Sequence, residues 1–214
     1  MEHHYWHGKW AHDDIAFHEG AANILLTRYA DRLPEGRLFL PLCGKTVDMA
    51  WLRARGHRIV GAELSETAVQ QFFAEHALRP EVTEGPEHLV YAAEGIEIHV
   101  GDLFKLTAEA LGPVAGIYDR AALVALPPSM QQAYVFHMHT VAGAVPRLLI
   151  SLDYPDGLIE GPPFATSGAR IAELHGPDVT VSVLEERDLP NGLKGRRPVT
   201  ETIYLVEPGG GGRP

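Results

Sequence analysis

The feature that most constrains this chain is an alternation, repeated along most of its length, between short apolar runs and longer segments with helical periodicity. The apolar runs have the length of strands, and the segments between them place apolar residues at helical spacing. Strands are predicted at 37–41, 58–64, 114–120 and 146–154, with two more around Glu94-Gly95 within 87–102, and helices at 46–57, 65–78, 128–141 and 168–176. This order favours an α/β domain in which helices cover both faces of a mostly parallel sheet.

The end of the chain departs from the alternation. Residues 179–189 and 199–207 both have strand character, and no helical segment separates them. Such neighbours are expected to pair antiparallel, so we predict a closing antiparallel hairpin. The glycine-rich residues 209–214 are expected to form a flexible tail, which leaves 1–208 as one domain.

A parallel sheet binds ligands beyond the carboxyl ends of its central strands, and the first such end here is the segment "FLPLCGKT". Its last three letters match the end of the nucleoside-triphosphatase loop, G-x-x-x-x-G-K-[ST]. The first glycine of that pattern falls on Phe39, and Pro41 has no amide hydrogen to offer a phosphate. The segment therefore does not predict a triphosphate site.

The dinucleotide pattern G-x-G-x-x-G fails at the same segment, because Leu42 and Val47 stand where glycines are needed beside Gly44. One part of the nucleotide-binding pattern is present, since Glu63 ends the next strand about twenty residues further on and can accept both ribose hydroxyls of an adenosine. An exposed carboxylate at a strand end is the plainer interpretation of Glu63. A ligand with an adenosine and no phosphate, such as S-adenosylmethionine, satisfies both observations.

Charge and composition exclude several functions. The formal net charge is −10 and no basic run interrupts the acidic surface, which disfavours nucleic acid as a partner. No apolar run approaches the ~18 residues of a membrane span, and the N-terminus lacks the features of a signal or transit peptide. The single cysteine, Cys43, and the spacing of the N-terminal histidines match no closed metal site. We expect a cytoplasmic protein without a metal or a membrane anchor.

Several separated motifs resemble the thiopurine S-methyltransferase family. They are "PLCGKTVDMAWLRARGHRIVGAELSETAVQQFF", "GIEIHVGDLF", "IYDRAALVALPP" and "LLISLDY" followed by "GPPF", in that order, preceded by the pattern Trp6-x3-Trp10-x6-Phe17-His18. The likeness covers roughly residues 5 to 190. It implies the seven-stranded class I methyltransferase sheet, Rossmann-like and mostly parallel with an antiparallel final strand, and S-adenosylmethionine as the cofactor.

The resemblance also implies roles for individual residues. Leu42 would contact the cofactor, Glu63 would hold its ribose, and Asp102 and Leu103 would border the adenine. Arg120, after the fourth strand of the family's sheet, would reach the methionine carboxylate and the substrate, and would be the residue that assists catalysis.

Taken singly, these residues have structural interpretations. Leu42 fits a core position, and Asp102 fits the cap of a following helix. Arg120 fits an ion pair with Asp119, and Cys43 fits packing. Lys45 has no predicted role.

The N-terminal aromatic residues Trp6, Trp10 and Phe17 lie in a polar segment and are not expected to remain in water. They fit a staple on the domain or a lid, formed by residues 1–20, that excludes water and contacts a sulfonium by cation–π attraction. We favour the lid, with all three aromatics at the cofactor and Phe17 also at the substrate.

The acceptor is less constrained than the cofactor. A heteroaromatic thiol or a chalcogen anion needs no strong base, in agreement with the lack of a Ser-His-Asp or Cys-His nucleophile pattern. Arg120 would help keep such a nucleophile anionic. The family's substrate-side arginine near the C-terminus corresponds to Arg196 or Arg197 in a shortened segment, and we predict Arg196.

The alternatives for the acceptor are selenium or tellurium oxyanions, halide or thiocyanate, and a nitrogen of a small azaheterocycle. A non-enzymatic module that binds S-adenosylmethionine is disfavoured, because none of the implied residues is missing. No long apolar stripe requires a protein partner, so the expected state is a monomer that acts on a small molecule.

Overall fold

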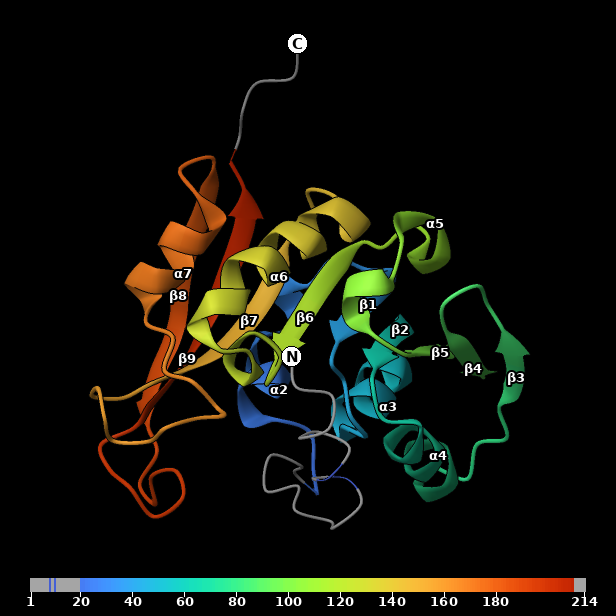
Figure 1. Ribbon diagram of the computed structural model, residues 1–214, viewed down its shortest axis with the longest axis horizontal. Coiled ribbons are helices and arrows are strands. Elements are labelled where there is room, and N and C mark those ends of the chain that lie inside the picture. Colours follow the sequence, from blue (N-terminus) through green and yellow to red (C-terminus); the bar gives the residue numbers. More distant parts are fainter. Residues whose placement is uncertain (1–7, 9, 11–19, 210–214) are drawn as a thin grey trace.

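A computed structural model describes residues 8, 10 and 20–209 and contains a nine-stranded sheet in the order β3-β4-β5-β2-β1-β6-β7-β9-β8 (Figure 1). The strands are β1 (Arg37–Pro41), β2 (Arg58–Glu63), β3 (Glu81–Glu84), β4 (Leu89–Ala93), β5 (Ile96–Val100), β6 (Gly116–Arg120), β7 (Arg147–Asp153), β8 (Val179–Asp188) and β9 (Thr200–Pro208). The predicted alternation of strands and helices is confirmed.

Seven of these strands, from β5 to β8 in the sheet order, form the predicted methyltransferase-type sheet, with the final strand β9 antiparallel to both of its neighbours. Strands β5, β2, β1, β6 and β7 run parallel to one another. The sheet is wider than seven strands because β4 pairs antiparallel with β5, and β3 pairs antiparallel with β4. The β4–β5 pair is the predicted hairpin around Glu94-Gly95. Strand β3 was not predicted, because all four of its residues are exposed and give no apolar pattern.

The helices are α2 (Ile24–Tyr29), α3 (Val47–Ala54), α4 (Glu66–Glu75), α5 (Ala108–Leu111), α6 (Pro128–Ala142) and α7 (Gly168–His175), with short 3-10 turns η1 (Ala30–Arg32), η2 (Leu103–Lys105) and η3 (Leu123–Ala125). Two of the caps follow the sequence directly. Thr46 caps α3 by accepting from the amide of Asp48, and Ser65 caps α4 by accepting from the amide of Ala68.

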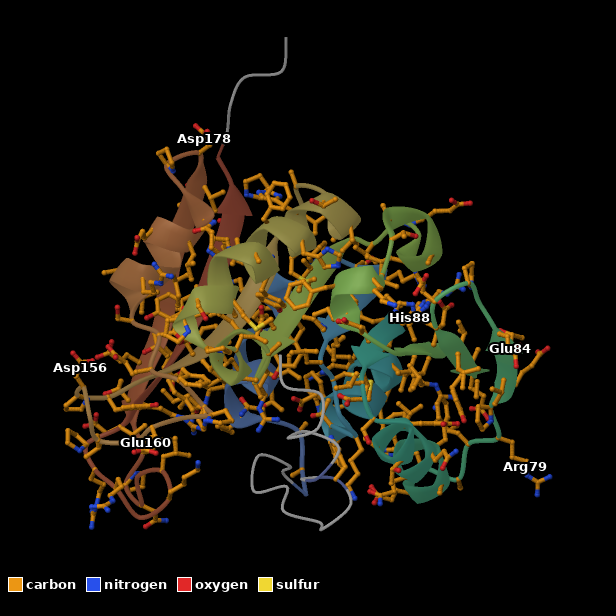
Figure 2. All side chains as sticks on the ribbon, in the orientation of Figure 1. Arg79, Glu84, His88, Asp156, Glu160 and Asp178 are labelled. Carbon is orange, nitrogen blue, oxygen red and sulfur yellow. The ribbon has the colours of Figure 1, made fainter. Side chains whose placement is uncertain are left out.

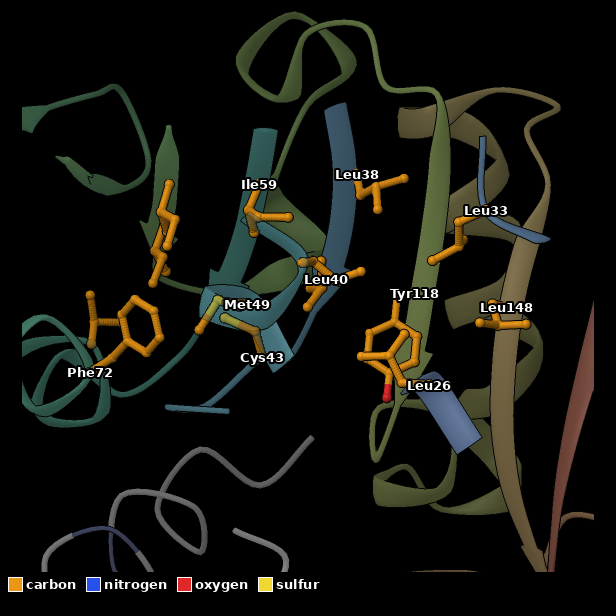
Figure 3. Packing of buried hydrophobic residues seen from close by; sticks show 14 of the residues in the cluster. Leu26, Leu33, Leu38, Leu40, Cys43, Met49, Ile59, Phe72, Tyr118 and Leu148 are labelled. Carbon is orange, nitrogen blue, oxygen red and sulfur yellow. The ribbon is translucent and has the colours of Figure 1, made fainter. Parts of the chain in front are cut away.

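Helices cover both faces of the sheet and divide the core into two layers. One layer packs α2, α3 and α4 on the face that carries Leu38, Leu40, Ile59 and Tyr118. Figure 3 shows part of this layer, including Cys43 and Tyr118. The second layer packs α5, α6 and α7 on the face that carries Phe39, Val60 and Ile117. Because successive strand residues point to opposite faces, the odd and even residues of each central strand enter different layers.

Both faces of the central strands are covered, so their apolar runs are nearly continuous; four of the five residues of β1 are buried. Many charged side chains lie at the periphery, as Figure 2 shows for Asp156, Glu160 and Asp178. Within residues 8, 10 and 20–209, none of the helices combines the length and the apolar character that crossing a membrane requires.

Candidate active site at the carboxyl ends of β1, β2, β5 and β6

Four neighbouring parallel strands end at the same edge of the sheet. The chain order along the sheet reverses between β1 and β6, which makes this the topological switch point at which open α/β sheets bind ligands. The predicted residues Leu42, Glu63, Asp102 and Arg120 follow or terminate β1, β2, β5 and β6 respectively. The structure therefore brings the ends that carry them to one edge of the sheet.

The turn after β1 has a left-handed backbone at two positions. Leu42 has φ 46° and Gly44 has φ 53°. Glycine adopts this conformation readily, but a branched residue such as Leu42 is strained there. Leu42 is partly buried and packs against the layer that contains α5 to α7. Strain of this kind is often found where a backbone is shaped for a ligand.

Cys43 and Lys45, in the same turn, have structural contacts. Cys43 is buried, and a Cβ atom placed on Gly61 would lie 2.7 Å from its Sγ atom, so the thiol fills the space that glycine leaves. Burial, followed by the nearby Glu63 carboxylate, raises the pKa of the Cys43 thiol well above its ordinary value. The predicted packing role of Cys43 is confirmed. Lys45 is nearly buried, and its Nζ lies 2.7 Å from Oε1 of Glu75 on α4.

Glu63 is 6% exposed, so the interpretation as an exposed strand-end carboxylate is wrong. Its Oε2 accepts from the amide of Gly44 at 2.8 Å, and its Oε1 accepts from the amide of Ser65 at 2.8 Å. Burial raises the pKa of Glu63, while the backbone hydrogen bonds from Ser65 and Gly44 oppose that rise. The carboxylate therefore holds the turn after β1 against the start of α4, and each of its oxygens has a second lone pair for a ligand hydroxyl.

The segment after β5 is fixed by two histidines that the sequence did not suggest. Nε2 of His88 lies 3.0 Å from the carbonyl oxygen of Asp102, and Nε2 of His137 on α6 lies 2.7 Å from that of Leu103. Each ring nitrogen faces an acceptor, so each donates. Burial lowers the pKa of His137, although its bond to the Leu103 carbonyl opposes that shift. Oδ1 of Asp102 accepts from the amide of Phe104 at 3.0 Å, which confirms the capping interpretation of this residue.

Arg120 ends β6 and is followed by Ala121, a second non-glycine residue in the left-handed region at φ 59°. The Arg120 side chain is 14% exposed, and its Nη1 lies 3.8 Å from Oδ2 of Asp48. Asp48 and Tyr118 belong to the layer with α3, and Arg120 has the same strand parity as Tyr118. The ion pair predicted as an alternative, between Arg120 and Asp119, is replaced by the pair with Asp48.

Asp119 points to the opposite face, where it is fully buried. Its Oδ2 accepts from the hydroxyl of Tyr134 at 2.7 Å and lies 3.6 Å from Nη1 of Arg147. Its Oδ1 accepts from the amide of Leu123 at 3.2 Å, which closes the turn that follows Arg120. Burial raises the pKa of Asp119, and the Arg147 charge opposes that rise.

Arg196 lies on the exposed connection between β8 and β9, where it forms an isolated bridge with Leu193. Asp153 at the end of β7 pairs with Thr200 at the start of β9, so this connection lies at the same edge of the sheet as the candidate site. It is separated from β6 by β7 in the sheet order. Nζ of Lys194 donates to the carbonyl of Pro162 at 2.9 Å and joins the connection to the loop after β7.

Of the predicted lid aromatics, only Trp10 lies within the described residues, and its side chain is 5% exposed. Burial agrees with the expectation that it is shielded from water, and both the lid and the staple satisfy it. Trp6 and Phe17 lie outside the described residues. Among the side chains that the structure does describe, no group of three or more His, Cys, Asp or Glu is arranged to hold a metal ion.

Comparison with known proteins gives the following matches. The family model for thiopurine S-methyltransferase matches residues 1–207. The thiopurine S-methyltransferase of Xanthobacter autotrophicus is 43% identical over 211 residues, which are 97% of this chain and 99% of that protein. The thiopurine S-methyltransferase of Gluconobacter oxydans is 42% identical over 207 residues, 95% of this chain and 94% of that protein.

Among solved structures, the fold is similar to that of Burkholderia thailandensis 1,6-didemethyltoxoflavin-N1-methyltransferase with bound 1,6-didemethyltoxoflavin and S-adenosylhomocysteine. The TM-score is 0.66 and the identity 13%, over 97% of this chain and 87% of that one. At this identity the likeness concerns the fold alone.

Proposed function

The chain belongs to the thiopurine S-methyltransferase family, and from this premise we propose that it transfers a methyl group from S-adenosylmethionine to a small-molecule thiol or chalcogen nucleophile. The observation that carries the proposal is the buried Glu63 at the end of β2, bonded to the left-handed turn after β1. A buried carboxylate at that strand end is suited to ribose hydroxyls. Pro41, next to the turn, has no amide hydrogen, so the turn lacks the continuous nest of amides that binds a phosphate. This agrees with an adenosine ligand that carries no phosphate.

The residues that would hold the cofactor surround that turn. Glu63 would accept from the ribose hydroxyls, Leu42 would contact the adenosyl group, and Asp102 with Leu103 would border the adenine. Their support is that each follows or terminates a central strand, and that hydrogen bonds to their side chains or carbonyls fix Glu63, Asp102 and Leu103. Such fixation reduces the ordering cost of binding. The bound cofactor would supply an electrophilic methyl group on a sulfonium sulfur.

Arg120 is the residue we propose to assist catalysis. A guanidinium that is 14% exposed attracts an anion more strongly than one in water, because the local dielectric is lower. It would hold the nucleophile in its anionic form and orient it, and it would also reach the methionine carboxylate. No general base is needed for an acceptor that is already ionised near neutral pH.

The acceptor class remains part of the proposal. Thiols and chalcogen anions agree with a cationic Arg120 and with the lack of a thiolate at Cys43, whose raised pKa keeps it protonated. Selenium or tellurium oxyanions, halide or thiocyanate, and an azaheterocycle nitrogen are the alternatives. Arg196 would contact the substrate if its exposed connection bends toward β6.

The N-terminal segment, residues 1–20, would act as a lid whose Trp6, Trp10 and Phe17 shield the cofactor, with Phe17 also at the substrate. The burial of Trp10 is compatible with this role. Residues 1–208 would form one domain with a short tail. We further propose a cytoplasmic monomer that acts on small molecules and not on nucleic acid, in agreement with the net charge of −10.

The experiment that tests the function measures S-adenosylhomocysteine release with a panel of thiols, selenite, tellurite, iodide and azaheterocycles. We expect a thiol or a chalcogen anion to be methylated. Arg120→Ala should lower kcat/KM about a hundredfold, since it removes a charge that stabilises the reacting anion. Arg53→Ala, which removes an arginine paired with Glu94, is the matched control and should leave kcat/KM near that of the wild type. An unchanged kcat/KM in Arg120→Ala contradicts the role assigned to Arg120.

Calorimetric titration with S-adenosylmethionine, NAD and ATP separates the proposal from its competitors. Tighter binding of NAD or ATP than of S-adenosylmethionine would contradict it. Binding of S-adenosylmethionine without methyl transfer to any acceptor would instead favour a non-enzymatic binding module.

A further inference from the structure

We propose that Asp48 is a positioning residue for methyl transfer, which sets the guanidinium of Arg120 and fixes the chain just before α2 beside it. The inference rests on the proposed role of Arg120. Asp48 is the second residue of α3 and is 1% exposed, although a carboxylate in the first turn of a helix ordinarily lies in water. A charge this deeply buried needs partners, and the identity of those partners shows what it does.

Two separate segments make three contacts with this carboxylate. Oδ1 of Asp48 accepts from the amide of Asn23 at 2.8 Å. Its Oδ2 accepts from the hydroxyl of Tyr118 at 3.0 Å and lies 3.8 Å from Nη1 of Arg120. The residues are separated by 25 positions in one direction and 70 in the other, so the sequence alone does not reveal the group.

The arrangement constrains the direction of the Arg120 side chain. Arg120 is the last residue of β6, and the backbone turns sharply after it at Ala121. A long arginine side chain at such a position loses considerable rotamer freedom when it is ordered. The buried carboxylate of Asp48 provides an attractive partner at one side of the guanidinium, and the Tyr118 hydroxyl fixes the carboxylate in turn. A planar guanidinium held on one side is orientated as a whole, because its five N–H donors form a rigid fork.

The contact between Asp48 and Asn23 connects Arg120, through Asp48, to the start of α2. Asn23 is buried and caps α2 by accepting from the amides of Leu25 and Leu26, while its own amide donates to Asp48. Asp48 therefore fixes both the start of α2 and the direction of Arg120 with one carboxylate. Loss of its charge should affect the acceptor step more than cofactor binding, because Glu63 holds the turn after β1 independently.

The test compares wild type, Asp48→Asn, Arg120→Ala and the double variant, with the thiol acceptor that gives the highest kcat/KM in the panel above. Asparagine keeps the shape of the side chain and removes its charge. We expect Asp48→Asn to lower kcat/KM for the acceptor about tenfold, because the ion pair that orientates Arg120 is lost. The Kd for S-adenosylhomocysteine should rise by a smaller factor, about threefold, because Arg120 is also proposed to reach the methionine carboxylate while Glu63 holds the turn after β1 independently. In the Arg120→Ala background the same substitution should cost less than about twofold, because its effect acts through Arg120.

Glu97→Gln is the matched control for loss of a paired carboxylate. Glu97 lies 3.0 Å from Nη2 of Arg37, near the amino ends of β5 and β1 and therefore at the opposite edge of the sheet. Kinetic constants near those of the wild type are expected for this variant. Equal losses in Asp48→Asn and Glu97→Gln would overturn the inference, since both would then report a general loss of stability.

A second variant keeps the inference testable if Asp48→Asn does not fold. Tyr118→Phe removes only the hydroxyl that fixes Asp48, and we expect the same pattern with a smaller loss of about threefold to fivefold. If Asp48→Asn or Tyr118→Phe lowers kcat/KM equally in the wild-type and the Arg120→Ala backgrounds, the inference is overturned. The proposed methyl transfer would not be affected by that result. A wild-type protein that methylates no acceptor would overturn both the proposed function and the inference.

Discussion

Replacing Glu63 by glutamine should weaken cofactor binding somewhat more than it weakens the fold. Glu63 accepts two backbone hydrogen bonds, from Gly44 and Ser65, each at 2.8 Å, and a glutamine offers only one oxygen for them. The amide group of the glutamine would face a backbone N–H with another N–H. One charge-assisted bond, about 1.5–3 kcal/mol, is lost, and the relief of burying a charge offsets part of it. We therefore expect the free energy of unfolding to fall by about 1–2 kcal/mol.

The loss in binding is larger because a ribose depends on the same two oxygens. A hydrogen bond to a charged acceptor contributes about 1.5–3 kcal/mol, and each 1.4 kcal/mol corresponds to about tenfold in Kd. The Kd of S-adenosylhomocysteine should therefore rise about tenfold to a hundredfold in Glu63→Gln. Calorimetry at about pH 8 is the suitable assay, because burial raises the pKa of Glu63 and a higher pH keeps the carboxylate ionised.

Glu66→Gln is the control for this measurement. Glu66 is three residues away on α4 and pairs with Gln70 and the hydroxyl of Tyr91, so its loss removes the same charge from the same region without touching the turn after β1. A Kd for S-adenosylhomocysteine in Glu63→Gln that stays within about threefold of the wild type, with the fold intact, would refute the assignment of the ribose to Glu63. A similar weakening in Glu66→Gln would attribute the effect to the general field and not to contact.

Three further predictions concern stability. Burial and the neighbouring Arg147 lower the pKa of His175 from 6.5 to about 4, so its contribution to stability is present above pH 6.5 and is lost as the pH falls toward 4. Between pH 7.5 and pH 5 the free energy of unfolding of the wild type should therefore fall by about 2 kcal/mol more than that of His175→Gln, as measured by urea unfolding. Gly61→Ala should cost about 1–3 kcal/mol, since its Cβ would lie 2.7 Å from Sγ of Cys43, and Cys43→Ala in the same chain should recover most of that cost in thermal unfolding. Lys45→Met breaks the ion pair with the half-exposed Glu75 and should lower the free energy of unfolding by no more than about 1 kcal/mol, with an unchanged Kd for S-adenosylhomocysteine. A large rise in that Kd would contradict the purely structural role of Lys45.

The order of strands and helices could be predicted from the sequence because hydrophobic periodicity is local. The buried strand at 37–41 and the hairpin around Glu94-Gly95 depend on neighbours within a few residues. Strand β3 and helix α2 could not be predicted in this way. The residues of β3 are all exposed, and α2 is six residues long, too short for its periodicity to be distinguished from chance.

The candidate site also has features that the sequence predicted and features that it did not. Glu63 was predicted because an acid at the end of the second parallel strand is part of the nucleotide-binding pattern. Asp102 was predicted because the resemblance to the methyltransferase family implied it. The contacts that fix this segment were not predicted. His88, just before β4, contacts the carbonyl of Asp102, and His137 on α6 contacts the carbonyl of Leu103. No pattern within one element shows that a histidine will meet a carbonyl fourteen or thirty-four residues away.

The backbone conformation at the switch point is a further feature of the site that the sequence does not predict. Leu42 and Ala121 follow β1 and β6, the two strands between which the chain order reverses, and both adopt the left-handed conformation that L-residues rarely occupy. Neither residue type predicts a left-handed backbone, because leucine and alanine are ordinary helix and core residues. Strain of about 1 kcal/mol or more at each persists only where the surroundings over-determine the backbone. Here Glu63 holds the first turn through Gly44, and Asp119 holds the second through Leu123, so two buried carboxylates on different strands maintain the shape of the edge at which the cofactor is proposed to bind.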